Sequence, residues 1–256
     1  MLNLLLTAAA AIFLFMSALF VVALIRKNNS LVDTAWGPGF ILVLAALFFR
    51  NPALDPAKIL LLVLIPLCGL RLAVHIFRRN AGKPEDFRYA KMRMDWGKTY
   101  ALKSFFFVFM LQGVLMLVVF SPAVLVFLSP ARPLNALDIA GTLVFLAGFL
   151  FETAADLQLA AHVRDPRNKG KLMTRGLWSL TRHPNYFGEA TLWWGIGLIA
   201  LSSEHGWAGL IGPAVITFLV RFVSGVPLLE KKYTGRPDWE TFKKRTPVFF
   251  PRLPRK

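Results

Sequence analysis

Residues 169–197, KGKLMTRGLWSLTRHPNYFGEATLWWGIG, begin as a basic loop and continue as an apolar stretch. Polar side chains gather where the two parts meet, at Arg175, Arg182, His183, Asn185, Tyr186 and Glu189. Arg offers paired donors to phosphate, and a helix N-terminus adds free backbone N–H groups, so the stretch predicts a phosphorylated ligand held at a membrane surface. A basic membrane anchor would explain the arginines alone, but not the histidine, asparagine, tyrosine and glutamate.

The composition predicts the class of protein. Hydrophobic residues make up 56% of the 256 residues, and the mean hydropathy is +0.54. These values predict an all-α, polytopic integral membrane protein with a single domain over residues 1–256, and they exclude an ordinary soluble domain. The net charge of +16 is attributed to membrane topology, and no nucleic-acid partner is expected. The single cysteine, Cys68, excludes an intrachain disulfide.

Apolar runs of about twenty residues predict about seven transmembrane helices. They cover residues 2–25, 35–49, 58–77, 104–128, 136–161, 186–201 and 207–229, and a polar tail follows at 230–256. The first run is long and has no basic leading segment, so a retained helix is expected rather than a cleaved signal peptide.

Lys and Arg are distributed unevenly between the two sides of these spans. Most of the 30 follow the first, third, fifth or seventh span, and only Arg50, Lys58 and Arg132 fall on the opposite side. Cytoplasmic loops carry the excess of cations in membrane proteins. The bias therefore predicts a cell inner membrane protein with its N-terminus outside and its C-terminus in the cytoplasm.

Ionisable residues also lie at or inside the predicted spans: Asp33, Arg71, His75, Glu152, Asp156, Glu189 and Arg221. Each costs roughly 2.5 kcal/mol or more at the bilayer centre, so such residues are usually functional. Together with Gln112 and Gln158, they predict a polar cavity that opens toward the cytoplasm. The alternative is that the two arginines pair with carboxylates as packing contacts. No metal site is expected, because the histidines and carboxylates match no ligand spacing and the nearby cations would repel a metal ion.

Three segments together carry a resemblance. GLWSLTRHPNYFGE (176–189), ETAADLQ (152–158) and RFVSGVPLLEKKY (221–233) are similar to the steroid 5α-reductase superfamily, in particular to a branch of short bacterial membrane proteins. Sterol reductases and isoprenylcysteine carboxyl methyltransferases carry a related core. The resemblance implies a seven-helix fold, NADPH in a cytoplasm-facing cavity, and a lipophilic small-molecule substrate that enters from the bilayer among membrane lipids.

The resemblance and the basic stretch together suggest which residues hold NADPH. They are Arg79, Asn80, Asp156, Lys171, Arg175, Arg182, His183, Asn185, Tyr186, Glu189 and Arg221. NADPH is favoured over NADH because the 2′-phosphate requires Arg or Lys. The implied reaction is hydride transfer to the β-carbon of an activated C=C bond, which would make the protein an oxidoreductase of lipid metabolism.

The catalytic pair is expected in the first half of the chain. In the steroid enzymes, a Gln-Glu pair in the second span and a Tyr in the third polarise the substrate ketone. Here Asp33 would replace the Glu as a neutral proton donor, and His75 would share its proton, because the third span has no Tyr. The alternative is that Asp33 only caps a helix. Gly225 and Leu229 stand where the steroid enzymes carry His and Tyr, so a 3-oxo-Δ4-steroid is not the expected substrate.

Two other functions stay open. The first is an S-adenosylmethionine-dependent methyltransferase acting on a lipid or prenyl-type substrate. Such enzymes usually carry paired Glu residues after the last span, whereas this chain has Glu230 alone. The second is a non-enzymatic lipid-binding membrane protein, which would bind no nucleotide.

Overall fold

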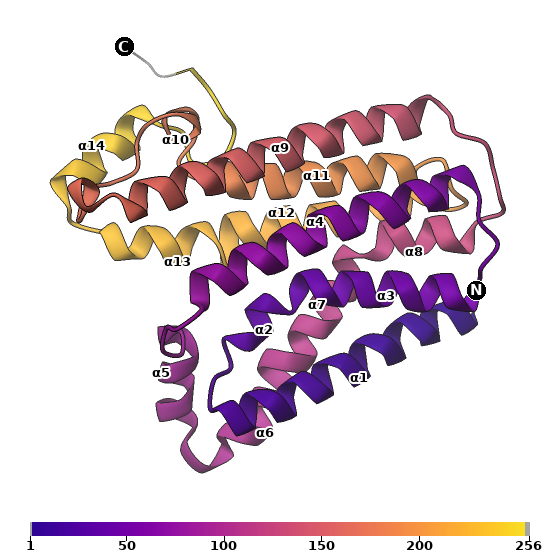
Figure 1. Cartoon of the computed structure of the whole chain (residues 1–256), viewed down its shortest axis with the longest axis horizontal. Coiled ribbons are helices and arrows are strands. Elements are labelled where there is room, and N and C mark those ends of the chain that lie inside the picture. Colours follow the sequence, from indigo (N-terminus) through magenta and orange to yellow (C-terminus); the bar gives the residue numbers. More distant parts are fainter. Residues whose placement is uncertain (1, 254–256) are drawn as a thin grey trace. The chain divides into compact units, whose positions relative to one another are not determined.

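The computed structural model describes residues 2–253, and every regular element among them is a helix (Figure 1). The all-α prediction is therefore confirmed. Residue 1 and the last predicted tail residues, 254–256, lie outside the described part. Within residues 2–253, five helices are long and apolar enough to cross a membrane: Leu2–Arg26, Pro56–Asn80, Phe87–Val119, Ala136–Arg164 and Gly206–Tyr233. These helices support a multi-pass membrane protein, while the count of seven stays a prediction.

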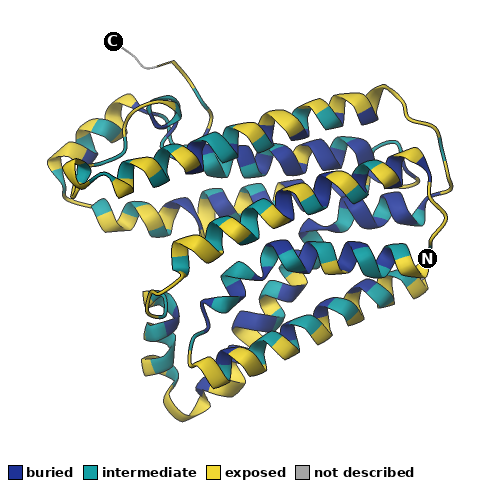
Figure 2. Ribbon diagram, in the orientation of Figure 1, coloured by how far each residue is buried: buried dark blue, intermediate teal, exposed yellow. Residues whose placement is uncertain are grey.

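The chain divides into two compact units. Unit 1 is Met1–Leu134 with Ser203–Ala208, and unit 2 is Asn135–Ser202 with Gly209–Lys256. Each unit has buried apolar residues of its own. Figure 2 colours the ribbon dark blue wherever a residue is buried. The prediction of a single domain stays a prediction.

Unit 1 begins the chain and combines two long helices with several shorter ones. Its helices are α1 (Leu2–Arg26), α2 (Leu31–Thr34), α3 (Trp36–Arg50), α4 (Pro56–Asn80), α5 (Phe87–Trp96), α6 (Tyr100–Ser104), α7 (Leu111–Val119) and α8 (Ser121–Leu128). The predicted span 104–128 is not one continuous α-helix. A π-helical stretch opens it at Phe105–Met110, and a new helix begins at Ser121 with Pro122 in its first turn. Proline fits a first turn because its missing N–H would have no intrahelical partner there.

Close contact between α3 and α4 depends on two glycines. A β-carbon on Gly37 would clash with the carbonyl oxygen of Gly69. Small residues of this kind let two membrane helices approach closely. On α1, by contrast, large apolar side chains point outward, with Leu14 66% and Phe13 53% exposed. An exposed apolar face of this kind suits lipid contact.

Unit 2 contains the region that carries the family resemblance. Its helices are α9 (Ala136–Arg164), α10 (Leu177–Leu180), α11 (Pro184–Ala200), α12 (Ile211–Phe218), α13 (Val226–Glu230) and α14 (Pro237–Arg245). Helix α9 starts with a capping box: Asn135 Oδ1 accepts from the backbone N of Leu137 at 2.9 Å, and Asp138 Oδ2 accepts from the backbone N of Asn135 at 2.9 Å. Such a cap satisfies the first N–H groups of a helix and fixes where it begins.

Glycines also bring α9 and α11 together, and the two helices lie side by side in Figure 1. A β-carbon on Gly188 would lie 2.6 Å from the backbone N of Glu152, and one on Gly195 would lie 2.5 Å from the backbone N of Phe145. The backbones therefore touch without intervening side chains. This contact places the buried carboxylates Glu152 and Asp156 beside the first turns of α11.

Candidate functional site

The basic loop of unit 2 is fixed to the end of α9 before α11 begins. The indole Nε1 of Trp178 donates to the carbonyl of Ala155 at 3.0 Å, and the backbone N of Leu177 donates to Gln158 Oε1 at 3.0 Å. Gly176 adopts a φ of 60°, a left-handed conformation that suits glycine. The sequence GLW thus makes the turn that docks α10 onto α9.

The segment between α10 and α11 pairs with the C-terminal tail. Hydrogen bonds of 2.9 Å run from the backbone N of Arg182 to Pro247 O, from the backbone N of Arg252 to Leu180 O, and from Thr181 Oγ1 to Phe249 O. Thr181 and Phe249 are both buried. The tail therefore forms part of the structure around the start of α11, instead of extending away from it.

Arg182 connects this segment to three other parts of unit 2. Its guanidinium donates to Glu230 Oε1 at 2.9 Å from Nε, and to the carbonyls of Lys243 at 3.2 Å and Thr246 at 3.4 Å from Nη1. The guanidinium carbon also lies 5.5 Å from the ring centroid of Trp239. With so many protein acceptors in place, Arg182 is poorly suited to bind a phosphate, and its predicted role in cofactor binding stays a prediction.

His183 shares the carboxylate that Arg182 binds. Its Nε2 lies 3.0 Å from Glu230 Oε1, and its ring stacks on Tyr186 with centroids 5.6 Å apart. His183 is buried, which lowers its pKa below the ordinary value, while the hydrogen bond to Glu230 acts in the opposite direction. The positive charges of Arg182 and Arg221 lower the pKa of His183 further.

A second polar pair joins α9 and α11 directly. The amide Nδ2 of Asn185 donates to Asp156 Oδ1 at 3.2 Å. Asp156 is buried, and Asn185 lies in the first turn of α11. The structure therefore brings together two of the predicted cofactor residues. Glu189 lies one turn further along α11 and is half-buried.

The predicted phosphate-binding cations lie before α10 and are exposed. Lys169, Lys171 and Arg175 form no ion pair within residues 2–253. The loop that carries them is held by its backbone, since His162 Nε2 lies 3.1 Å from Lys171 O and Arg236 donates to Gly170 O at 3.0 Å. Uncommitted cations on a fixed loop fit an anionic ligand such as a dinucleotide phosphate.

Arg79 and Asn80, also predicted to hold the cofactor, belong to unit 1. They lie at the end of α4, where Arg79 Nε donates to Asn80 Oδ1 at 3.1 Å. Arg221 of unit 2 lies in the π-helical stretch Leu219–Val223, with its guanidinium 4.7 Å from the ring centroid of Phe222.

Unit 1 holds a polar network around Asp33. Oδ1 of Asp33 accepts from the hydroxyl of Tyr89 at 2.7 Å, and Oδ2 accepts from Arg88 Nη2 at 2.8 Å. Arg88 also donates from Nε to Asp86 at 2.9 Å. Asp33 thus accepts hydrogen bonds from two residues of α5 and makes no side-chain cap, since the cap position of α2 belongs to Ser30.

Tyr89 is the functional candidate that the sequence reasoning missed. It is buried, with 4% of its surface exposed, and its hydroxyl is bonded to Asp33. The available signal was the tyrosine in PEDFRY (84–89), twelve residues beyond the third span, whereas the resemblance implies a tyrosine within that span. His75, the predicted partner of Asp33, lies half-buried on α4. Asp33 bonds to Arg88 and Tyr89 and not to His75, and the catalytic roles of Asp33 and His75 stay predictions.

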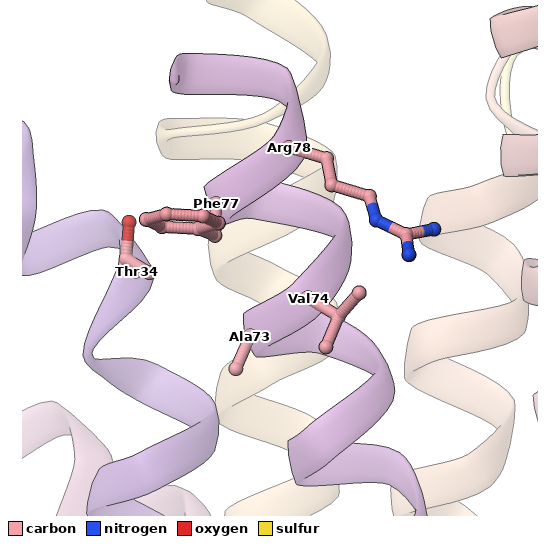
Figure 3. Close-up of a pocket in the computed structure, with 5 residues that line it drawn as sticks. All are labelled: Thr34, Ala73, Val74, Phe77 and Arg78. Atoms are coloured by element: carbon pink, nitrogen blue, oxygen red, sulfur yellow. The ribbon is translucent and has the colours of Figure 1, made fainter.

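An open depression of about 480 Å³ lies beside Thr34, the residue that follows Asp33 in the sequence (Figure 3). It is lined by Thr34, Ala73, Val74, Phe77 and Arg78. Phe77 points toward Thr34 of α2, and its side chain is largely exposed. Arg78 is the one charged residue of this lining. The depression therefore offers an apolar surface that suits a lipophilic molecule.

The helices and their exposed apolar faces define a helical, multi-pass membrane protein. Residues 19–246 match the family DUF1295, described as a protein family of unknown function, and the chain belongs to that family. It is a membrane family that resembles the steroid 5α-reductases. The likeness noted from the sequence is thus shared by the family, while membership of the steroid 5α-reductase superfamily stays a prediction.

Two relatives extend the comparison. The probable O-methyltransferase ustE of Ustilaginoidea virens is 36% identical over 102 residues, which cover 39% of this chain and 34% of the relative. This chain therefore matches only about a third of that relative's length. An uncharacterized protein of Schizosaccharomyces pombe is 24% identical over 94% of this chain and 78% of the relative. No solved structure matches the chain.

Proposed function

We propose that the protein is an NADPH-dependent reductase of an activated C=C bond in a lipophilic substrate taken from the bilayer. The observation that carries the proposal is the pair formed by Asp33 and Tyr89, in which a carboxylate holds a buried hydroxyl at 2.7 Å. The apolar depression beside Thr34 gives a lipophilic molecule a surface in the same unit. The reductase-like character of the family supports the same activity.

The chemistry of such a reduction requires a hydrogen-bond donor. Hydride addition to an activated C=C bond places negative charge on the conjugated carbonyl oxygen, and a fixed donor stabilises that charge where it develops. In the Asp33–Tyr89 pair, the transferable proton lies on Tyr89. A carbonyl oxygen that reached the pair would compete with Asp33 for that proton. Tyr89 thus becomes the proposed donor, and Asp33 the residue that holds and orients it.

Residues of unit 2 would bind the cofactor. Lys171 and Arg175 are exposed and without ion-pair partners among residues 2–253, which suits the phosphates and in particular the 2′-phosphate. Asp156 and Asn185 offer carboxylate and amide groups for hydroxyl and carboxamide partners. NADPH would supply the hydride. Arg182 is left out of this set because its guanidinium is occupied by protein acceptors.

Methyl transfer from S-adenosylmethionine is the second candidate. It is favoured by the similarity to the probable O-methyltransferase ustE over 102 residues. An O-methyl transfer needs no donor at a substrate carbonyl, so the Asp33–Tyr89 pair would have no evident role in it.

Ligand binding to the purified protein in detergent separates these functions. The melting temperature would be measured with NADPH, NADH and S-adenosylmethionine, since a ligand that binds only the folded state stabilises it by about 2.7 kcal/mol at a hundredfold excess over Kd. We expect stabilisation by NADPH, a weaker effect of NADH, and none by S-adenosylmethionine. Stabilisation by S-adenosylmethionine alone would establish the second candidate instead.

A pair of lysine variants tests the proposed phosphate contact. Lys171→Ala should weaken NADPH binding while leaving NADH binding unchanged, because only NADPH carries the 2′-phosphate. Lys244→Ala is the matched control: Lys244 is another exposed lysine of unit 2, on α14, and it is expected to change neither affinity. Equal effects of the two variants would place the phosphate elsewhere.

A further inference from the structure

The hydroxyl of Tyr89 has a second partner that the proposed reaction does not yet use. Gln112 of α7 donates from Nε2 to the Tyr89 hydroxyl at 3.3 Å. The other end of the same amide, Oε1, accepts from the indole Nε1 of Trp36 at 2.8 Å. A continuous chain of hydrogen bonds therefore runs from Trp36 through Gln112 and Tyr89 to Asp33.

The direction of this chain follows from the chemistry of its two ends. An indole N–H can only donate, so the amide atom facing Trp36 must be the oxygen of Gln112. The amide NH2 then faces Tyr89, whose oxygen must accept. At the other end, Asp33 accepts from Tyr89 and from Arg88. The proton of Tyr89 is consequently directed away from Gln112.

We propose that Gln112 is a positioning residue for Tyr89 and that Trp36 sets its orientation. A hydroxyl that accepts a hydrogen bond becomes a stronger donor, because hydrogen bonds in a chain polarise one another. Gln112 therefore strengthens the donor that the proposed reduction requires and stabilises the oxygen of Tyr89 when its proton moves. This inference rests on the proposed function for its catalytic consequence, but not for its geometry.

Burial makes this arrangement effective. Tyr89 is 4% exposed, and its hydroxyl therefore depends on protein partners more than on water. Trp36 is the first residue of α3, and Gln112 lies in the first turn of α7. The four residues of the chain therefore come from four different helices, α2, α3, α5 and α7. The hydroxyl of Tyr89 is thus held by groups on elements other than its own.

The geometry can be tested without any substrate. The protein has only four tyrosines, so tyrosine labelled with ¹³C at Cζ gives few NMR signals, and Tyr89→Phe identifies that of Tyr89. We expect Gln112→Met to move the Tyr89 signal and Trp36→Phe to move it as well, although Trp36 does not bond to Tyr89. In a Gln112→Met background, Trp36→Phe should have no further effect. If Trp36→Phe leaves the signal in place, or moves it equally in both backgrounds, the proposal fails.

The catalytic consequence is tested by NADPH oxidation with a panel of α,β-unsaturated ketones. Gln112→Met should lower kcat about tenfold, as one lost hydrogen bond would, with little change in KM. Asn51→Leu is the matched control, since Asn51 donates to the carbonyl of Phe127 beyond the end of α3 opposite to Trp36, and it should retain the wild-type kcat. Turnover by Gln112→Met equal to that of the wild type overturns the inference. Failure of the wild type to bind or oxidise NADPH would refute the proposed function instead, and the NMR result would still decide the geometry.

Discussion

Unit 1 and unit 2 each gather charged and polar side chains, but they use them differently. In unit 1, Asp33 and Arg88 hold a single hydroxyl, that of Tyr89, and Thr34 beside Asp33 lines an open apolar depression. In unit 2, Arg182 donates to Glu230 and to backbone carbonyls, so its charge stabilises the folded structure of that unit.

The difference shows that a dense run of charges does not locate a binding site by itself. Arg182 lies at the end of a basic stretch of unit 2, yet its donors are occupied. Lys171 and Arg175, only a few residues earlier, form no ion pair among residues 2–253. Whether a cation can bind a ligand depends on which acceptors the fold brings to it.

The largest effect is expected for the hydroxyl of unit 1. Tyr89→Phe should lower the rate of reduction by roughly 10²–10⁴-fold, as the loss of a general acid does, while NADPH still binds. Asp33→Asn should lower the rate less, because an amide can still accept from Tyr89. Steady-state kinetics with an enone substrate measures both. If Tyr89→Phe reduced the substrate at the wild-type rate, Tyr89 would not be the donor, and unit 1 would lose its proposed role in the reaction.

The next effect concerns the stability of unit 2. Arg182→Ala removes the ion-pair partner of Glu230, leaving it only His183, and removes the donor of two backbone carbonyls. We therefore expect a loss of about 3 kcal/mol, the size found when one partner of a buried ion pair is removed. Arg175→Ala should cost almost nothing, because Arg175 is exposed. Chemical unfolding in detergent measures both. Equal stability of the two variants would show that Arg182 does not have the structural role described.

A smaller effect is expected where α9 meets α11. A methyl group on Gly188 would lie 2.6 Å from the backbone of Glu152, so Gly188→Ala should cost about 2 kcal/mol by forcing the helices apart. Ala161→Ser, at an exposed position of α9, serves as the control and should change stability by less than about 0.5 kcal/mol. A Gly188→Ala protein as stable as the control would mean that the crossing is looser than the structure shows.

The smallest effect is a pH dependence of the stability of unit 2. Burial lowers the pKa of His183, so the folded protein keeps the ring neutral where the unfolded chain, with a pKa of about 6.5, takes up a proton. The stability contribution is complete above pH 6.5 and is lost as the pH falls through that value toward the folded pKa. Melting temperatures between pH 8 and 5.5 should therefore fall more for the wild type than for His183→Gln. Parallel curves would contradict the neutral, buried histidine.

Local patterns predicted much of the fold. Apolar runs indicated the long helices α1, α4 and α9 to within a few residues at most ends, because the length of an apolar run reflects the thickness of a bilayer. The break at Phe120 was missed because the residues on both sides of it are equally apolar. Helix α5 was missed because its sequence is polar and its partners lie elsewhere in the chain.

The polar contacts were harder to predict because they join distant parts of the sequence. Tyr89 lies 56 residues from Asp33, and Glu230 lies 48 residues from Arg182. No spacing rule relates such residues. The sequence therefore identified Asp33 and Asn185 as candidates, but not that Tyr89 would be the partner of the first or that Arg182 would bind the tail.

The pairing between Leu180–Arg182 and the tail also sets an order of events during synthesis. The carbonyls of Pro247 and Phe249 that bind this segment are made more than sixty residues after it. Because the chain is made from its N-terminal end, α9 and α11 can form and pack while Arg182 still lacks these acceptors. This end of unit 2 is completed only after residue 252 has left the ribosome. A nascent chain halted before that point would lack the hydrogen bonds between the tail and the segment that precedes α11.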